Sequence, residues 1–144
     1  MRARTDAAAT HYRCDRQSEL ARCTEKGTLW HVPGQNLGGV FFRSKNGTEP
    51  VRAWLVALPK EIRLEIGSDI ERVQWRWPVS KPLVGALGGG LYEVRVGVDG
   101  NIYRVFFCIV GSDMVLLHGF MKKTQKTPEK ELALARDRQK ELKS

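Results

Sequence analysis

The sequence lacks the features that mark several common classes of protein. Its longest apolar run, VFFCIV at 105–110, is far shorter than the roughly 20 residues that a membrane-spanning helix needs. Residues 1–13, MRARTDAAATHYR, contain no apolar stretch of the kind found in a secretory leader. The three cysteines are an odd number without a Cys-x-x-Cys pair. We therefore expect no membrane partner, and a protein of the reducing cytoplasm.

Ligand patterns for metals and nucleotides are missing as well. The intervals between His11, Cys14, Cys23 and His31 match no common zinc site, so plain solvated side chains are the better interpretation of these four residues. The three glycines at 88–90 lack the spacing of a P-loop or a dinucleotide fingerprint. No cluster of acidic residues suggests magnesium. The sequence predicts neither a metal site nor a cofactor.

Positive charge is present in excess and is concentrated near the C-terminus. The chain has 24 Lys and Arg against 16 Asp and Glu, which gives a net charge of +8. Residues 121–144 hold eight basic and four acidic side chains, whereas residues 41–120 hold ten and eight. Such an excess attracts nucleic acid or an anionic membrane, but it informs about association and not about fold. A nucleic-acid interpretation therefore needs a local site.

The length of 144 residues and the 42% hydrophobic content suit one folded domain with an extension. Residues 1–39 have no sustained helical or strand period and end in the loop-like PGQNLGG, so we expect an N-terminal extension that is largely irregular. Residues 40–144 are expected to form the folded domain, which begins with a short strand at 40–44.

Two short amphipathic helices are predicted after this strand. Thr48 or Glu49 precedes Pro50, a pattern that starts a helix, and the apolar residues then recur at intervals of three and four as far as residue 58. Pro59 ends this helix and begins a second one over about 60–77. The joint apolar face of this helical hairpin needs a sheet to cover. Packing, rather than base stacking, is expected of three tryptophans: Trp54, Trp75 and Trp77.

The stretch 91–110 is predicted to form a β-hairpin around Asp99 and Gly100, a dipeptide that favours a tight turn. If these two residues form the centre of the turn, Arg95 lies directly opposite Arg104. Like charges that face each other across strands are destabilising, so either a carboxylate or a bound anion must neutralise the pair. Glu93 lies on the same face, two residues before Arg95.

Two explanations of this cluster remain open at this point. A salt-bridged Glu-Arg-Arg group on an exposed sheet face would contribute about 1 kcal/mol or less to stability. A phosphate site is the alternative, because the planar fork of arginine matches phosphate oxygens.

A third strand is predicted at 114–120, and its register determines whether its polar side chains share the face of the two arginines. With a three-residue loop at 111–113, His118, Phe120 and Lys122 project on the face of the two arginines. A two-residue loop turns all three to the other face, because strand side chains alternate. A lone histidine after an apolar strand is more often structural than catalytic.

A final helix is predicted to begin at Pro128, with Thr127 as its cap. Its apolar positions are few, so it should lie across the sheet or the helical hairpin with one side. Three lysines within five residues come just before it and suggest a convergent basic patch, with a solvated turn as the alternative: Lys122, Lys123 and Lys126.

Several stretches of the chain resemble a known family. They are PLVGALGGGLYEVRV at 82–96, GNIYRVFF at 100–107, LLHGFMKKTQKTP at 116–128, and the helix that contains ALARDR at 133–138. Together they look like the RelE/HigB superfamily of type II toxins, specifically its phage-related HigB-like branch. The resemblance covers about residues 40–142 and leaves residues 1–39 outside.

The resemblance implies an α+β, RelE-like fold, in which an N-terminal helical hairpin packs on a small antiparallel sheet that is followed by a C-terminal helix. It also implies an mRNA endoribonuclease, commonly ribosome-associated, that is masked by a cognate antitoxin, typically a helix-turn-helix protein. The family's basic positions fall on Arg95, Arg104, Lys122 and Lys123. Gly85 stands where relatives often carry Lys, and the C-terminal Tyr of some RelE toxins has no counterpart.

RNA cleavage without a metal uses the 2′-OH of the RNA as nucleophile, so the protein must stabilise a charged phosphorane and move two protons. The two arginines suit the charge. Lys122 or Lys123 suits the charge or the protonation of the leaving oxygen, and Glu93 or His118 is the candidate base. Further RNA contacts are expected from Tyr92, Gln125 and Lys126.

Two rival functions belong to other classes. One is a module that grips RNA, DNA or an acidic partner without cutting, such as a degenerate toxin. The other is a purely structural phage protein.

Overall fold

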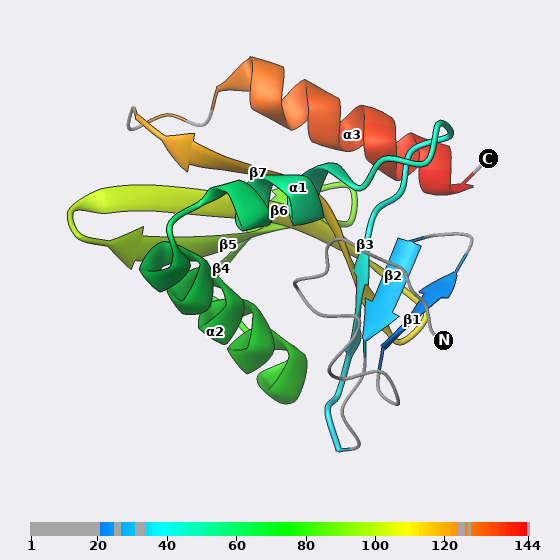
Figure 1. Ribbon diagram of the computed structural model, residues 1–144, viewed down its shortest axis with the longest axis horizontal. Helices are drawn as coiled ribbons and strands as arrows, with labels where there is room; N and C mark the ends of the chain where they lie inside the picture. Colours follow the sequence, from blue (N-terminus) through cyan, green and yellow to red (C-terminus); the bar gives the residue numbers. More distant parts are fainter. Residues whose placement is uncertain (1–20, 25–26, 31–33, 124–125, 127, 144) are drawn as a thin grey trace.

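Seven strands form one sheet with the strand order β1-β2-β3-β7-β6-β5-β4 in a computed structural model of the chain, which describes residues 21–24, 27–30, 34–123, 126 and 128–143 (Figure 1). The strands are β1 (Ala21–Thr24), β2 (Gly27–Trp30), β3 (Gly38–Phe41), β4 (Val84–Gly88), β5 (Leu91–Val98), β6 (Asn101–Val110) and β7 (Asp113–Lys122). All neighbours are antiparallel except β3 and β7, which run parallel. The sheet is therefore mixed.

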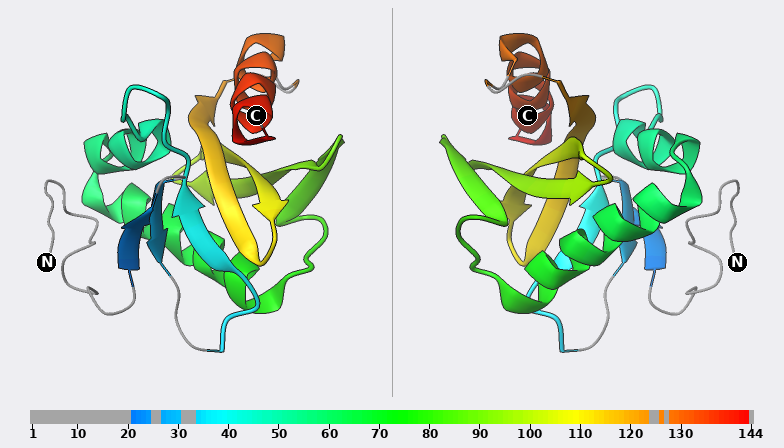
Figure 2. Two further views of the ribbon diagram at one scale, coloured as in Figure 1. Left: turned by 90° about the vertical axis from the view of Figure 1, so that its right-hand side faces the viewer. Right: turned by 90° about the vertical axis from the view of Figure 1, so that its left-hand side faces the viewer.

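Three helices cover the two faces of this sheet. Helices α1 (Pro50–Ala57) and α2 (Lys60–Arg76) lie on one face, and α3 (Glu129–Lys143) lies on the other, over β6 and β7 (Figure 2). Each face has its own core of buried side chains: Val94, Val105 and Phe107 point toward α1 and α2, whereas Phe106 and Leu117 point toward α3. The predicted α+β class, the helical hairpin and the C-terminal helix are confirmed.

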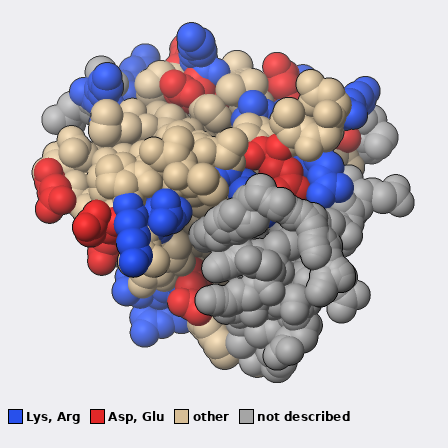
Figure 3. All heavy atoms as spheres, viewed as in Figure 1, with Lys and Arg blue, Asp and Glu red and all other residues tan. Residues whose placement is uncertain are grey.

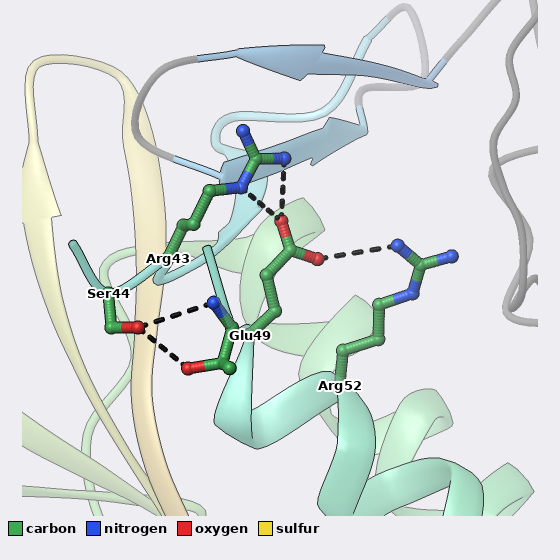
Figure 4. Close-up of polar contacts among 5 residues, drawn as sticks. Arg43, Ser44, Glu49 and Arg52 are labelled. Carbon is green, nitrogen blue, oxygen red and sulfur yellow. Dashed lines mark hydrogen bonds and ion pairs between the residues drawn. The ribbon is translucent and has the colours of Figure 1, made fainter. Parts of the chain in front are cut away.

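The start of α1 follows the predicted pattern, with Glu49 at the N-cap and Pro50 as the first helical residue. The Glu49 carboxylate makes no cap hydrogen bond. Instead it binds Arg43 at 2.9 Å and Arg52 at 3.3 Å, while the Ser44 hydroxyl lies 3.3 Å from the backbone nitrogen of Thr48 (Figure 4). These contacts join the chain that follows β3 to the first turn of α1.

The sheet extends further than the sequence predicted. Residues 1–39 were expected to be largely irregular, yet β1, β2 and the first residues of β3 lie in this range, and β2 pairs with both β1 and β3. Strand β4, which no sequence pattern predicted, pairs with β5. These strands have four or five residues each, too few to show a period of their own, and they form by pairing with neighbouring strands of the sheet.

The Asp99-Gly100 turn sets the register that the sequence predicted, with Arg95 opposite Arg104. The loop between β6 and β7 has two residues, because Val110 pairs with Asp113, so a three-residue loop is wrong. A β-bulge then inserts Leu117 as an extra residue of β7 and shifts the register by one. As a result, His118 pairs with Phe106 and shares the face of the two arginines, as a three-residue loop would have placed it.

The tryptophans that were expected to pack differ in their exposure. The Trp54 ring lies where a side chain at Gly119 of β7 would stand, and Trp77 packs edge-on against Phe107 with 5.7 Å between ring centroids. Trp75 is 42% exposed, although its ring lies next to Gly34. The packing role is therefore confirmed for the first two.

Candidate active site

The site residues come from three neighbouring strands on the face that α3 partly covers. Alternation along each strand turns Arg95 of β5 and Arg104 of β6 to the same side, and Phe120 of β7 pairs with Arg104. Two pairs further toward the open end of the β6–β7 hairpin, and on the same face, Lys122 lies opposite Ile102, whose side chain is 44% exposed. The result is a row of cations at the edge of the α3-side core.

Glu93 is the centre of this arrangement and is buried to 3% exposure. Its Oε2 accepts a hydrogen bond from Nε of Arg95 at 3.1 Å, and Nη2 of the same arginine lies 3.1 Å from that oxygen. Its Oε1 lies 3.3 Å from Nε of Arg104. One carboxylate therefore serves two guanidinium groups, and the cluster keeps a net positive charge.

The contact between Glu93 and Arg104 is an ion pair without hydrogen-bond geometry. Among the described residues, Glu93 Oε1 and Arg104 Nε are the two buried side-chain polar atoms that have no hydrogen-bond partner. A buried polar group without a partner is costly, so this arrangement suits a site that is completed by a ligand. The Arg104 side chain is 11% exposed, and burial lowers its pKa, with Glu93 opposing and Arg95 adding to the effect.

The lysines of the basic run differ in position. Lys122, at the end of β7, is half-buried, and its pKa is lowered by burial and by the charge of Arg104, while Glu93 opposes both. Lys123 and Lys126 are exposed beyond the end of the strand. Lys122 is thus the lysine that the sheet places beside the arginines.

His118 is held by α3 at both ring nitrogens. Its Nε2 lies 2.5 Å from Oε1 of Glu131, and Arg138 donates to Nδ1 at 3.3 Å. Since an arginine can act only as a donor, Nδ1 is the acceptor and Nε2 carries the proton. The ring also stacks on Phe120 with 5.6 Å between centroids. This neutral histidine is engaged as a docking residue for α3.

Residues 53–140 match the family described as "Phage derived protein Gp49-like (DUF891)", a family of RelE/HigB-like toxins. The match covers more than half of the chain, including β4 to β7 and nearly all of α3. The chain belongs to this family. The Gp49-like family is associated with the toxins of toxin–antitoxin systems, and this implies an antitoxin partner. No curated protein matches the chain significantly.

Not every predicted site residue of this Gp49-like protein lies at the cluster. Tyr92 points to the opposite face, where its ring packs against Trp77 at 5.1 Å and against Phe107 at 5.5 Å between centroids. Its expected contact with RNA is therefore not supported. Gln125 lies outside the described residues, as do His11, Cys14 and His31 of the metal pattern; Cys23 lies in β1, but its side chain is not described. Among the side chains that are described, no group of three metal-ligating residues forms.

The polar residues by which α3 docks on the sheet were not predicted from the sequence. Arg136 donates to the carbonyl of Leu87 at 2.9 Å, and Gln139 donates to that of Gly89 at 3.0 Å. Arg138 donates to the carbonyl of Leu117 at 2.9 Å, at the bulge of β7. A signal was present, since Glu131 and Arg138 are seven residues apart and so share a helix face with the few apolar residues of α3.

The outer surface near α3 carries charges of both signs. Figure 3 shows Asp and Glu interspersed with Lys and Arg along the upper edge, where α3 lies, whereas the surface over α1 and the β5–β6 hairpin has few charges. The excess of basic residues near the C-terminus therefore does not form a patch of one sign on this face. Within the described part of the chain, no helix is long and apolar enough to cross a membrane.

Proposed function

We propose that this Gp49-like protein is the toxin of a type II toxin–antitoxin pair and cleaves mRNA without a metal, in association with the ribosome. The observation that carries the proposal is the pair of arginines around one carboxylate. The guanidinium of Arg104 makes an ion pair with Glu93 but donates no hydrogen bond to any described residue, so it is not committed to an acceptor of the protein. A buried guanidinium without a hydrogen bond to the protein is suited to bind an anion from outside, such as a phosphate of RNA.

The proposed reaction uses the 2′-OH of the RNA as nucleophile. The 2′-oxygen forms a bond to phosphorus while the bond from phosphorus to the 5′-oxygen breaks, which leaves a 2′,3′-cyclic phosphate and a 5′-hydroxyl. Arg104 and Arg95 stabilise the negative charge that develops on the phosphorane. Their fixed positions in adjacent strands orient the phosphate before the reaction.

Two protons must move in this reaction. Lys122 is assigned as the donor to the leaving 5′-oxygen, because its lowered pKa makes the ammonium a better acid and it lies next to the arginines. Glu93 is assigned as the acceptor of the 2′-OH proton, since its carboxylate lies beside both arginines. His118 is not assigned, because α3 occupies both of its ring nitrogens.

The test uses the full chain and its Arg104→Ala variant. We expect the wild-type protein to arrest growth on induction and to produce new mRNA 5′ ends that primer extension detects. The variant should lose both effects while it still folds and still binds the cognate helix-turn-helix antitoxin. Arg76→Ala, at an exposed arginine of α2, is the matched control and should remain toxic.

The chemistry is tested in vitro with purified protein, ribosomes and mRNA. A message with 2′-deoxyribose at the cut position should resist cleavage. A fully toxic Arg104→Ala variant would overturn the proposal. Growth arrest without new mRNA ends would instead indicate a protein that binds RNA, DNA or an acidic partner without cutting.

A further inference from the structure

Position 85 in β4 carries no side chain, and the guanidinium of Arg95 fills the space beside it. Gly85 pairs with Glu93 and therefore faces the same side of the sheet as the site. A Cβ at this position would lie 2.6 Å from Nη2 of Arg95 and 3.1 Å from Oε2 of Glu93. The shorter distance is below any normal carbon–nitrogen contact, so Arg95 would have to move.

The glycine is not required by the backbone. Gly88, Gly89 and Gly90 have positive φ angles, which favour glycine, but Gly85 does not. Its neighbour on the site face, Arg95, is the reason that a larger residue does not fit. The clash is with the far end of a long side chain, so an alanine at position 85 displaces the guanidinium and leaves the sheet intact.

We infer that Gly85 is a positioning residue. Because it has no side chain, Arg95 can lie against Glu93, and Arg104 thereby stays available to the phosphate. The inference rests on the proposed function for its effect on RNA, but not for its effect on Arg95. While Arg95 occupies Oε2 of Glu93, Arg104 is held by one long contact to Oε1. If Arg95 withdraws, the buried carboxylate keeps Arg104 as its remaining cation, and a buried charge draws its partner close.

The single methyl group that Gly85→Ala adds should therefore weaken the contacts of both Arg95 and Arg104 with the phosphate. Arg95 loses its fixed position, and Arg104 becomes committed to Glu93. We expect the affinity for RNA to fall on the order of tenfold, which corresponds to the coupling found between residues in contact. Gly97→Ala is the matched control, because Gly97 lies on the same face of β5 and a Cβ there meets nothing within 4 Å.

The first measurement does not depend on RNA. In side-chain ¹⁵N–¹H spectra of the full chain, the Nε–H signal of Arg95 reports its hydrogen bond to Glu93, and Arg95→Ala identifies that signal. Gly85→Ala should shift it or broaden it, and Gly97→Ala should leave it in place. An unchanged Arg95 signal in Gly85→Ala would overturn the inference, whether or not the protein cleaves RNA.

The second measurement is a double-mutant cycle on binding of a 2′-O-methyl oligoribonucleotide, which lacks the reacting hydroxyl. Fluorescence anisotropy should show weaker binding for Gly85→Ala and no further loss when Gly85→Ala is added to Arg95→Ala. An equal loss in both backgrounds would show that Gly85 does not act through Arg95. Equal binding by the wild-type protein, Arg95→Ala and Arg104→Ala would reject the proposed function, while the spectra still decide what holds Arg95.

Discussion

Arg95 and Arg104 face each other across β5 and β6, and one buried carboxylate lies against both. Glu93 neutralises one of the two positive charges. The proposed anion would neutralise the other, because the guanidinium of Arg104 makes no hydrogen bond within the described part of the protein. The proposal thus combines the two explanations that the sequence left open, an internal salt bridge and a phosphate site.

Removal of the Glu93 charge should destabilise the fold. Glu93→Gln keeps the size of the side chain but leaves two arginines facing each other without a carboxylate. We expect the free energy of unfolding to fall by about 1–3 kcal/mol, the usual cost of leaving a buried polar group without its partner. Urea denaturation at low ionic strength measures this change, and Glu71→Gln at an exposed position of α2 is the control.

An anion should compensate for the missing carboxylate. Sulfate stabilises both proteins by the same general effect of the salt. It should stabilise Glu93→Gln more than the wild-type protein, because in the variant the anion also takes the place of the missing carboxylate between the two arginines. An unfolding midpoint of Glu93→Gln that equals that of the wild type would contradict the role assigned to this residue.

Gly119 should tolerate no side chain. A Cβ there would lie 2.4 Å from two ring carbons of Trp54, so Gly119→Ala forces α1 away from β7. Overpacking of this kind costs about 1–3 kcal/mol. Urea denaturation should show that loss for Gly119→Ala and little change for Gly97→Ala, which has open space around it. Replacing Trp54 with leucine in the Gly119→Ala variant should restore part of the lost stability; additive losses would refute the clash.

The docking of α3 through His118 should make stability depend on pH. Burial lowers the pKa of His118 below its usual value of 6.5, with Arg138 adding to the effect and Glu131 opposing it. The unfolded chain therefore takes up a proton at a higher pH than the folded chain does. Stability should fall as the pH drops below about 6.5 toward the lower pKa of the folded state.

The matched comparison is His118→Gln, which cannot be protonated. The difference in unfolding free energy between wild type and variant should shrink as the pH is lowered from 8 to 5. A difference that stays constant over this range would show that His118 does not titrate in the way its surroundings imply.

The sequence by itself determined the local features. Asp99 and Gly100 set the hairpin register, because a two-residue turn leaves no freedom in which residues pair, and this brought Arg95 opposite Arg104. The apolar intervals and the prolines placed the three helices, because helix starts and stops depend on residues that are close in sequence.

Tertiary structure decided the features that depend on distant residues. The bulge at Leu117 forms where β7 pairs with β6 and where Arg138 of α3 binds the Leu117 carbonyl, and it turns His118 to the site face after a two-residue loop. Strands β1, β2 and β4 form by pairing with neighbours, and His118 is held by residues 13 and 20 positions further along the chain. A local pattern can place Glu131 and Arg138 on one helix face, but it does not encode which residues they meet, because the energy of these contacts comes from surfaces that meet only in the folded chain.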